Sequence, residues 1–184
     1  GLQLLMIVKN LSPVIRSDAW YFLDVFLRKA IEGHLTFADF FVKRPRTDHS
    51  QPLFKLVLWL EWRYFDLDFM IEALIGAFAA ACCALIFHRL IFDAARPSRG
   101  WAVRCLAWAT ICGLLFSMNA EAGVWTWPLV TLEYLNIMGV LLFVMASWQA
   151  IHKRSYALLA MATVLIGICC DDLGLIAVIA VALA

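Results

Sequence analysis

The chain has 184 residues, of which 64% are hydrophobic and 16% charged, with a mean hydropathy of +0.84. Soluble domains average roughly 45–50% apolar and about 25% charged residues. This composition argues against a soluble domain and predicts an integral membrane protein that is all-α. The net charge of +1 gives no global support for nucleic-acid binding, so no nucleic-acid partner is expected.

Residues 1–65 are expected to form an outer (periplasmic) loop with two interfacial amphipathic helices. The run Gly1–Val8 is interpreted as the tail of an earlier span. Ser17 is a suitable N-cap for the first interfacial helix, Asp18 falls in its first turn, and Gly33 ends it. The apolar residues of this helix recur at helical spacing: Trp20, Phe22, Leu23, Phe26, Leu27 and Ile31.

The second interfacial helix is expected to begin at Ser50, with Pro52 in its first turn. Its apolar residues are Leu53, Leu56, Val57, Leu60 and Trp62, whereas Lys55, Glu61 and Arg63 lie on other faces. Residues 9–63 hold nine basic side chains: Lys9, Arg16, Arg28, Lys29, Lys43, Arg44, Arg46, Lys55 and Arg63. This cluster predicts contact with anionic lipid head groups or with a phosphate-bearing ligand.

Residues 66–184 are expected to form a transmembrane helical bundle of four to five spans, incomplete at its end. A span needs about 20 mainly apolar residues. The candidates are Leu67–Phe92, Ala102–Met118, Leu135–Ile151 (extended back toward Trp127), Tyr156–Cys170 and Leu173–Ala184. Asp171 and Asp172 either form a turn or line a polar cavity. Glu72 is expected to lie close enough to the outer surface to be hydrated.

Basic residues predict the orientation of these spans. They gather in the connection after the first span and in the one after the third: Arg89, Arg96, Arg99, Arg104, Lys153 and Arg154. The stretch between Met118 and Leu135 has no Lys or Arg. We therefore expect both of these basic connections on the cytoplasmic side. Residues 119–134 and the segment before Leu67 are then expected outside.

Two strings carry a resemblance to a known family. Residues 47–69, TDHSQPLFKLVLWLEWRYFDLDF, begin with a polar-His-polar stretch and lead from the large outer loop into a span, and residues 114–135, LLFSMNAEAGVWTWPLVTLEYL, contain the outer turn after a later span. Together with the topology, they resemble bacterial members of the GT-C class of membrane glycosyltransferases. The resemblance implies a multi-pass protein of the bacterial inner (cytoplasmic) membrane. It also implies an N-terminal fragment of a longer chain, because members of that class are more than twice this length.

The same resemblance implies a sugar transfer from a polyprenyl-phosphate donor to a lipid or polysaccharide acceptor of the cell envelope. By its position in the first outer loop, Asp18 is the implied catalytic base, because a carboxylate can accept the proton of an attacking sugar hydroxyl. The alternative is that Asp18 only favours the N-terminus of its helix electrostatically. Asp24, on the same helix, is a weaker candidate.

Donor or substrate binding is expected in the polar link between the two outer helices. Arg44 and Arg46 can hold a phosphate, while Asp48 and His49 can bind a sugar or a divalent cation. The alternative is a solvated loop that touches lipid head groups. The identity of any cofactor stays open, because two ligands do not define a metal site.

Glu121 and Trp127 are expected to face the same outer cavity, with Trp127 as a stacking wall for a sugar or, alternatively, an interfacial anchor. The partners expected for an enzyme are membrane lipid and a lipid-linked sugar. The alternative function is a non-catalytic membrane subunit that packs against partner proteins in a larger complex.

Overall fold

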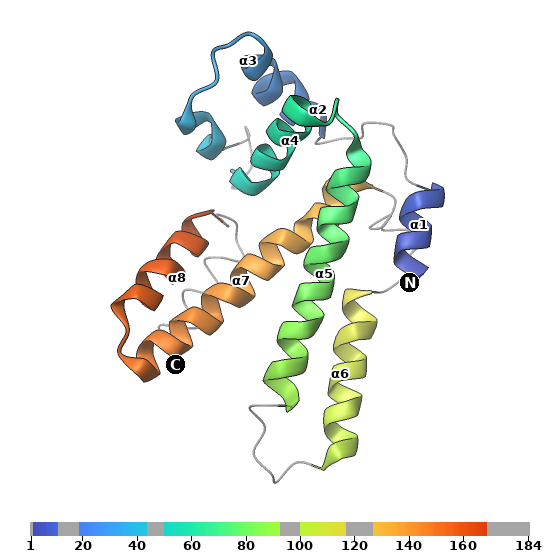
Figure 1. Cartoon of the computed structure of the whole chain (residues 1–184), viewed down its shortest axis with the longest axis vertical. Helices are drawn as coiled ribbons and strands as arrows, with labels where there is room; N and C mark the ends of the chain where they lie inside the picture. Colours follow the sequence, from blue (N-terminus) through green and yellow to red (C-terminus); the bar gives the residue numbers. More distant parts are fainter. Residues whose placement is uncertain (1, 11–18, 44–49, 93–99, 117–126, 169–184) are drawn as a thin grey trace.

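The computed structural model describes residues 2–10, 19–43, 50–92, 100–116 and 127–168 (Figure 1). Every regular element within these residues is a helix, which confirms the all-α prediction. In chain order the elements are α1 (Leu2–Asn10), α2 (Ala19–Tyr21), the π-helix η1 (Phe22–Leu27), α3 (Arg28–Ile31), the 3₁₀-helix η2 (Phe37–Phe41), α4 (Pro52–Tyr64), α5 (Phe69–Phe92), α6 (Trp101–Leu115), α7 (Pro128–Lys153) and α8 (Tyr156–Ile168).

The helices form two parts (Figure 1). The first, here called the cap, comprises residues 19–43 and 50–64 and lies at the N-terminal end of α5. The second, here called the bundle, comprises α1 and α5–α8. Within the bundle, α6 runs antiparallel beside α5, α7 crosses α5, and α8 returns beside α7.

Two helices in the described part of the chain are long and apolar enough to cross a membrane. They are α5, with 24 residues, and the Thr131–Lys153 portion of α7, with 23. The α7 helix does extend back to Pro128, as predicted. The predicted spans Ala102–Met118 and Tyr156–Cys170 correspond to α6 and α8, whose described lengths are 15 and 13 residues. The span predicted at Leu173–Ala184 lies outside the described residues.

The crossing of α5 and α7 depends on a glycine. A Cβ atom built on Gly76 of α5 would overlap the backbone carbonyl of Thr131 in α7. The two backbones are therefore in direct contact at this point. The rest of the buried face of α5 is also made of small residues: Ala73, Ala79, Ala80, Cys83 and Ala84. Small residues permit the close approach typical of helix pairs packed in a membrane.

Large apolar side chains of the bundle point outward instead. Phe78 and Leu85 of α5 are 69% and 66% exposed, and Leu106 and Leu114 of α6 are 70% and 73% exposed. A soluble protein rarely presents so continuous an apolar surface to water. Small residues at the helix contacts and large ones outside favour a lipid surrounding for the bundle.

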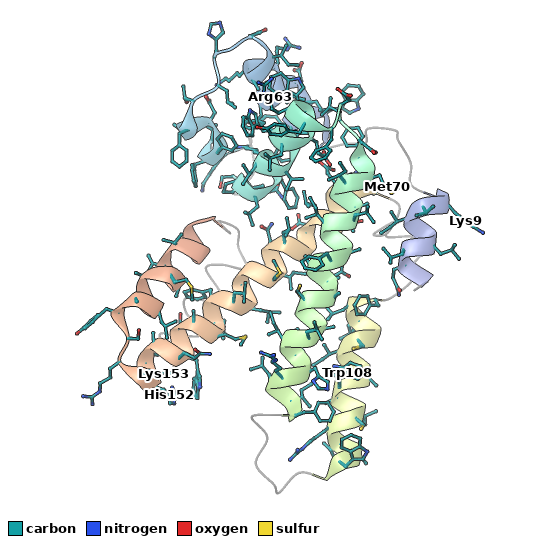
Figure 2. The ribbon with its side chains drawn as sticks, in the orientation of Figure 1. Lys9, Arg63, Met70, Trp108, His152 and Lys153 are labelled. Carbon is teal, nitrogen blue, oxygen red and sulfur yellow. The ribbon has the colours of Figure 1, made fainter. Side chains whose placement is uncertain are left out.

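The basic ends of the helices lie far from the cap. Arg89 is in the last turn of α5, and Figure 2 shows His152 and Lys153 at the end of α7 opposite the cap. Figure 2 also shows Trp108 between α6 and α5, where its ring meets that of His88 edge-on at 5.6 Å. The basic ends of α5 and α7 and the cap are thus on opposite ends of the bundle, and the orientation of the bundle in a membrane stays a prediction.

The first helix of the cap differs from the prediction in its interior. The chain is helical from Ala19 to Ile31, but η1 makes a π-helical stretch in which the Arg28 N–H donates to the Leu23 carbonyl five residues earlier. The predicted end is confirmed. Gly33 has φ +76°, and the His34 N–H donates to the Lys29 carbonyl at 2.9 Å, which closes the helix as glycine C-caps do.

The two predicted interfacial helices pack against each other. Phe22, Phe26 and Leu27 form a small core with Leu58 of α4. On its other side, α4 contacts the bundle through Phe54, which is buried against Leu132 of α7. The α4 helix therefore lies between the rest of the cap and the bundle, and most of its circumference is covered. A position of either helix in the membrane interface stays a prediction.

The α5–α7 contact generates a paired prediction. Gly76→Ala should destabilise the bundle by about 1–3 kcal/mol, because its methyl group has no room against the Thr131 backbone. Gly113→Ala in α6 should be neutral or stabilising by up to about 1 kcal/mol, because nothing lies within 4 Å of its Cβ position. Thermal unfolding of both variants in detergent checks this, and equal effects would contradict the close contact.

Candidate functional site

Most of the predicted site residues cannot be placed. Asp18, Arg44, Arg46, Asp48, His49 and Glu121 lie outside the described residues, as do Asp171 and Asp172. Trp127 and the weaker candidate Asp24 are described. Their predicted roles therefore stay predictions, and the candidate site has to be built from the side chains that surround these segments.

Trp127 lies at the start of α7. Its carbonyl accepts hydrogen bonds from the Thr131 N–H at 3.1 Å and from the Thr131 hydroxyl at 3.2 Å. Pro128 then supplies the first helical residue, where a missing N–H does no harm. Trp127 is thus half-buried one turn before the α5–α7 crossing, at the same end of the bundle as the cap.

Lys55 fixes the chain that leads into the predicted binding link. Although it is only 2% exposed, its ammonium group donates to the carbonyls of Asp39, Phe40 and Val42 at 3.1, 3.1 and 2.6 Å. It also lies 5.7 Å from the centre of the Phe26 ring. Burial lowers the pKa of Lys55 to about 8, so the group stays mostly charged at neutral pH. With all three donors engaged, Lys55 acts as a structural clamp.

Asp39 completes this part of the cap. Its carboxylate accepts hydrogen bonds from Lys29 at 2.6 Å and from the Thr36 N–H and hydroxyl, each at 2.8 Å. Thr36 and Asp39 form a capping box at the start of η2. The hydrogen bond from Lys29, with those from Thr36, holds the pKa of the Asp39 carboxyl well below its usual range. Charged groups thus hold both ends of η2, with Asp39 bonded to Lys29 and Thr36 at its start and Lys55 bonded to the Val42 carbonyl after its end.

The chain after the link is fixed to the bundle. Gln51, which has a left-handed φ of 47°, donates from its side-chain amide to a carboxylate oxygen of Glu133 in α7 at 3.1 Å. Asn136 donates to the other carboxylate oxygen, also at 3.1 Å. The flank before residues 44–49 is therefore held by α4 through Lys55, and the flank after them is held by α7 through Glu133.

A hollow of about 600 Å³ lies on the face of the first cap helix. It is lined by Trp20, Tyr21, Leu23, Asp24, Val25, Arg28 and Ile31. Asp24 and Arg28 form an exposed ion pair there, and Trp20 is 58% exposed. An aromatic ring beside a carboxylate and a guanidinium can stack on a sugar ring and hydrogen-bond to its hydroxyls. Five of these residues belong to α2 and η1, so the π-helical turn shapes the hollow.

Two glutamates are buried where the cap meets the bundle. Glu61 of α4 is 1% exposed and Glu72 of α5 is 4% exposed, which corrects the expectation of a hydrated Glu72. The Glu72 carboxyl lies against that of Glu61. Neither side-chain oxygen of Glu61 accepts a hydrogen bond of ordinary geometry from the described part of the chain. Burial, followed by the charge of Glu72, raises the pKa of Glu61 well above its usual value.

Sequence reasoning assigned no role to Glu61. It counted Lys55 among the basic side chains expected to contact lipid head groups or a phosphate, and the burial of Lys55 against three carbonyls corrects that expectation. Both fall off the apolar stripe of α4, and a polar residue there is usually solvated. One signal in the sequence could have indicated their burial. In α4, most residues around Lys55 and Glu61 are apolar, so little of the helix surface is left to face water. Glu72 was visible as a carboxylate inside a candidate span, and such residues are functional candidates by default.

No group of three or more His, Cys, Asp or Glu side chains that could hold a metal ion occurs among the described residues. Asp48 and His49, where a divalent cation was considered, are not among them. Comparison of the chain with protein-family models, with curated proteins and with solved structures finds no match.

The Lys55 clamp generates the next prediction. Lys55→Met should destabilise the cap by roughly 2–3 kcal/mol, because three carbonyls lose a charged donor that reaches them from a buried position. Arg63→Met is the matched control, since Arg63 lies on the same helix and is exposed. Hydrogen exchange should show faster exchange at residues 37–42 in the first variant alone. Unchanged exchange there would exclude the clamp.

Proposed function

We propose that this chain is part of a membrane glycosyltransferase of the GT-C class. It would transfer a sugar from a polyprenyl-phosphate donor to a lipid or polysaccharide acceptor at the outer face of a bacterial inner membrane. The protein would cross that membrane several times, with the cap outside. The proposal rests on the resemblance of residues 47–69 and 114–135 to that class.

One observation on the fold supports this proposal more than any other. The chain builds a folded polar cap at one end of two long apolar helices, and it fixes both flanks of residues 44–49 there, through Lys55 on one side and Gln51 on the other. A link that holds two arginines and an Asp-His pair suits a donor phosphate at a membrane surface. Fixed flanks reduce the conformational entropy that such a link loses when it binds a ligand.

The hollow on the first cap helix adds a second supporting feature. Trp20 and the Asp24–Arg28 pair offer an aromatic face and hydrogen-bonding groups of both signs. The hollow lies on the helix that follows Asp18 directly in the sequence. An acceptor sugar held there would be close along the chain to the proposed base.

The proposed reaction is a single displacement at the anomeric carbon of the donor sugar. The acceptor hydroxyl attacks that carbon, and its proton passes to the Asp18 carboxylate. The bond between the anomeric carbon and the phosphate oxygen breaks, and polyprenyl phosphate leaves with the electron pair. Arg44 and Arg46 would stabilise the negative charge that develops on the leaving phosphate.

The catalytic role of Asp18 is tested in membranes that contain the full-length protein. With radiolabelled polyprenyl-phosphate hexoses supplied one at a time, Asp18→Asn should lower sugar transfer at least about 100-fold, as expected for loss of a general base. Glu32→Gln, an exposed carboxylate at the end of the first cap helix, should leave transfer unchanged. Equal membrane levels of both variants are required.

Retained transfer in Asp18→Asn would exclude its role as base. An absence of any transfer by the wild-type protein would favour the alternative, a non-catalytic membrane subunit. That alternative further predicts that the protein is isolated in mild detergent as a stable complex with other membrane proteins.

The proposed orientation is tested by cysteine labelling. In a background whose six native cysteines are replaced, Asp48→Cys and Glu121→Cys should react with a membrane-impermeant maleimide in intact cells. Lys153→Cys, at the opposite end of the bundle, should react only after the membrane is opened. The reverse pattern would invert the topology and remove the proposed site from the outer face.

A further inference from the structure

The least usual polar contact in the described structure is the one between Glu61 and Glu72. Glu61 lies in the last turn of α4, and its backbone carbonyl accepts the N–H groups of Phe65 at 2.9 Å and Leu67 at 3.2 Å. Asp66 and Leu67 adopt left-handed backbone conformations that turn the chain back at once into α5. This tight turn brings the first turn of α5, with Glu72, against the end of α4.

No cation of the described structure neutralises this pair. The acidic groups on the elements packed against α4 are Glu72 of α5, Asp68 of the turn, Glu133 of α7, Asp24 of η1 and Asp39 of η2. The basic groups of these elements, Arg89 and Lys153, lie in the last turns of α5 and α7, and Lys9 lies in the last turn of α1, which packs against α5. Only Glu72 and Asp68 act on Glu61, and both are acidic. Lys55, on α4 itself, donates to three carbonyls about two turns away from Glu61.

Two buried carboxylates in contact cannot both stay ionised without a bound positive charge. Mg²⁺ and Ca²⁺ take six or more oxygen ligands and Zn²⁺ usually takes four ligands, and the described chain adds no third acidic, histidine or cysteine side chain to this pair. A proton needs only the two facing carboxyl oxygens. It converts one group into a donor for the other, which gives the side chain of Glu61 the partner that it otherwise lacks.

We infer that Glu61 and Glu72 form a binding site for one proton, which the two carboxyl groups share and which joins the cap to the bundle. With the proton bound, a strong carboxyl–carboxylate hydrogen bond links α4 to α5. When it is lost, two like charges face each other across the same junction, and the cap is released from α5. The inference concerns the junction alone and does not depend on the proposed sugar transfer.

The sign of the pH dependence follows from the raised pKa of Glu61. Between the pKa of an unfolded glutamate and that of the folded pair, the folded protein binds more protons than the unfolded one. The contribution of the pair to stability is therefore full at a pH below the pKa of the unfolded glutamate. It is lost as the pH rises through the pKa of the folded pair. Asp39 adds no pH dependence of stability in this pH range, because its pKa lies below the usual value for an aspartate.

The test is thermal unfolding of the full chain in detergent between pH 5 and pH 9. The melting temperature of the wild type should fall by an amount on the order of 5 °C more than that of Glu61→Gln/Glu72→Gln. Lys55, whose pKa burial lowers to about 8, also titrates in this range, but both proteins contain it, so the difference isolates the pair. Glu32→Gln, at an exposed site, should follow the wild-type curve.

The single variants test the sharing of one proton. Glu61→Gln and Glu72→Gln each place a permanent amide donor against the remaining carboxylate and remove one of the two like charges, so each should fold and show a smaller extra pH dependence than the wild type. Infrared difference spectra should show a protonated carboxyl group at neutral pH in the wild type that Glu61→Gln/Glu72→Gln lacks. This measurement on the wild type remains decisive if a variant does not fold.

Three results would overturn the inference. One is an equal pH dependence in the wild type and the double variant. Another is the absence of a protonated carboxyl signal at neutral pH. The third is stabilisation of the wild type at pH 9 by Na⁺, Mg²⁺ or Ca²⁺ that the double variant does not show, because the ligand would then be a metal cation.

Discussion

The backbone contact between α5 and α7 at Gly76 and Thr131 sets the position of everything else in the described structure. It lies about two turns from the start of α5 and one turn from the start of α7, so the N-terminal ends of both helices emerge side by side. Those ends carry the groups that hold the cap, with Glu72 on α5 and Glu133 on α7. A wider crossing would separate these two anchors and leave α4 with only one of them.

The α4 helix connects the rest of the cap to the two crossed helices of the bundle. Its apolar residues face two ways, with Phe54 against the bundle and Leu58 against the first cap helix. Between these apolar contacts it buries a lysine and a glutamate whose environments differ. Lys55 has three carbonyl acceptors and remains charged, whereas Glu61 has another carboxyl as its neighbour. The cap therefore depends on one cation that is fully hydrogen-bonded and on one acidic pair that requires a proton.

The bundle and the cap follow opposite packing rules. In the bundle, small residues meet at the contacts and large apolar side chains point outward, because lipid accepts them as readily as another helix does. In the cap, Phe22 and Phe26 are buried and the Asp24–Arg28 pair is exposed, as expected for a part that meets water, but Ile31 and Phe37 are also exposed, at 61% and 80%. The change from one kind of packing to the other occurs at the turn between α4 and α5. It supports a cap that stands at a membrane surface.

The sequence by itself determined the features that depend on composition and local pattern. Hydropathy identified α5 and α7, Gly33 marked the end of the first cap helix, and Pro52 marked the start of α4. Each of these follows from residues adjacent in the chain, as did the placement of the basic helix ends away from the cap. The roles of Asp18 and of residues 44–49 rest on the sequence alone, since those residues are not described.

The tertiary structure decided which polar residues are buried. A helical pattern predicts on which side of α4 Lys55 and Glu61 lie, but it does not predict that other elements of the fold cover that side. That cover comes from η2 for Lys55 and from α5 for Glu61, elements separated from α4 by a polar link and by a tight turn. The π-helical turn of η1 was likewise invisible, because its apolar spacing fits an α-helix equally well. Burial and charge pairing depend on contacts between elements, and only the folded chain brings those elements together.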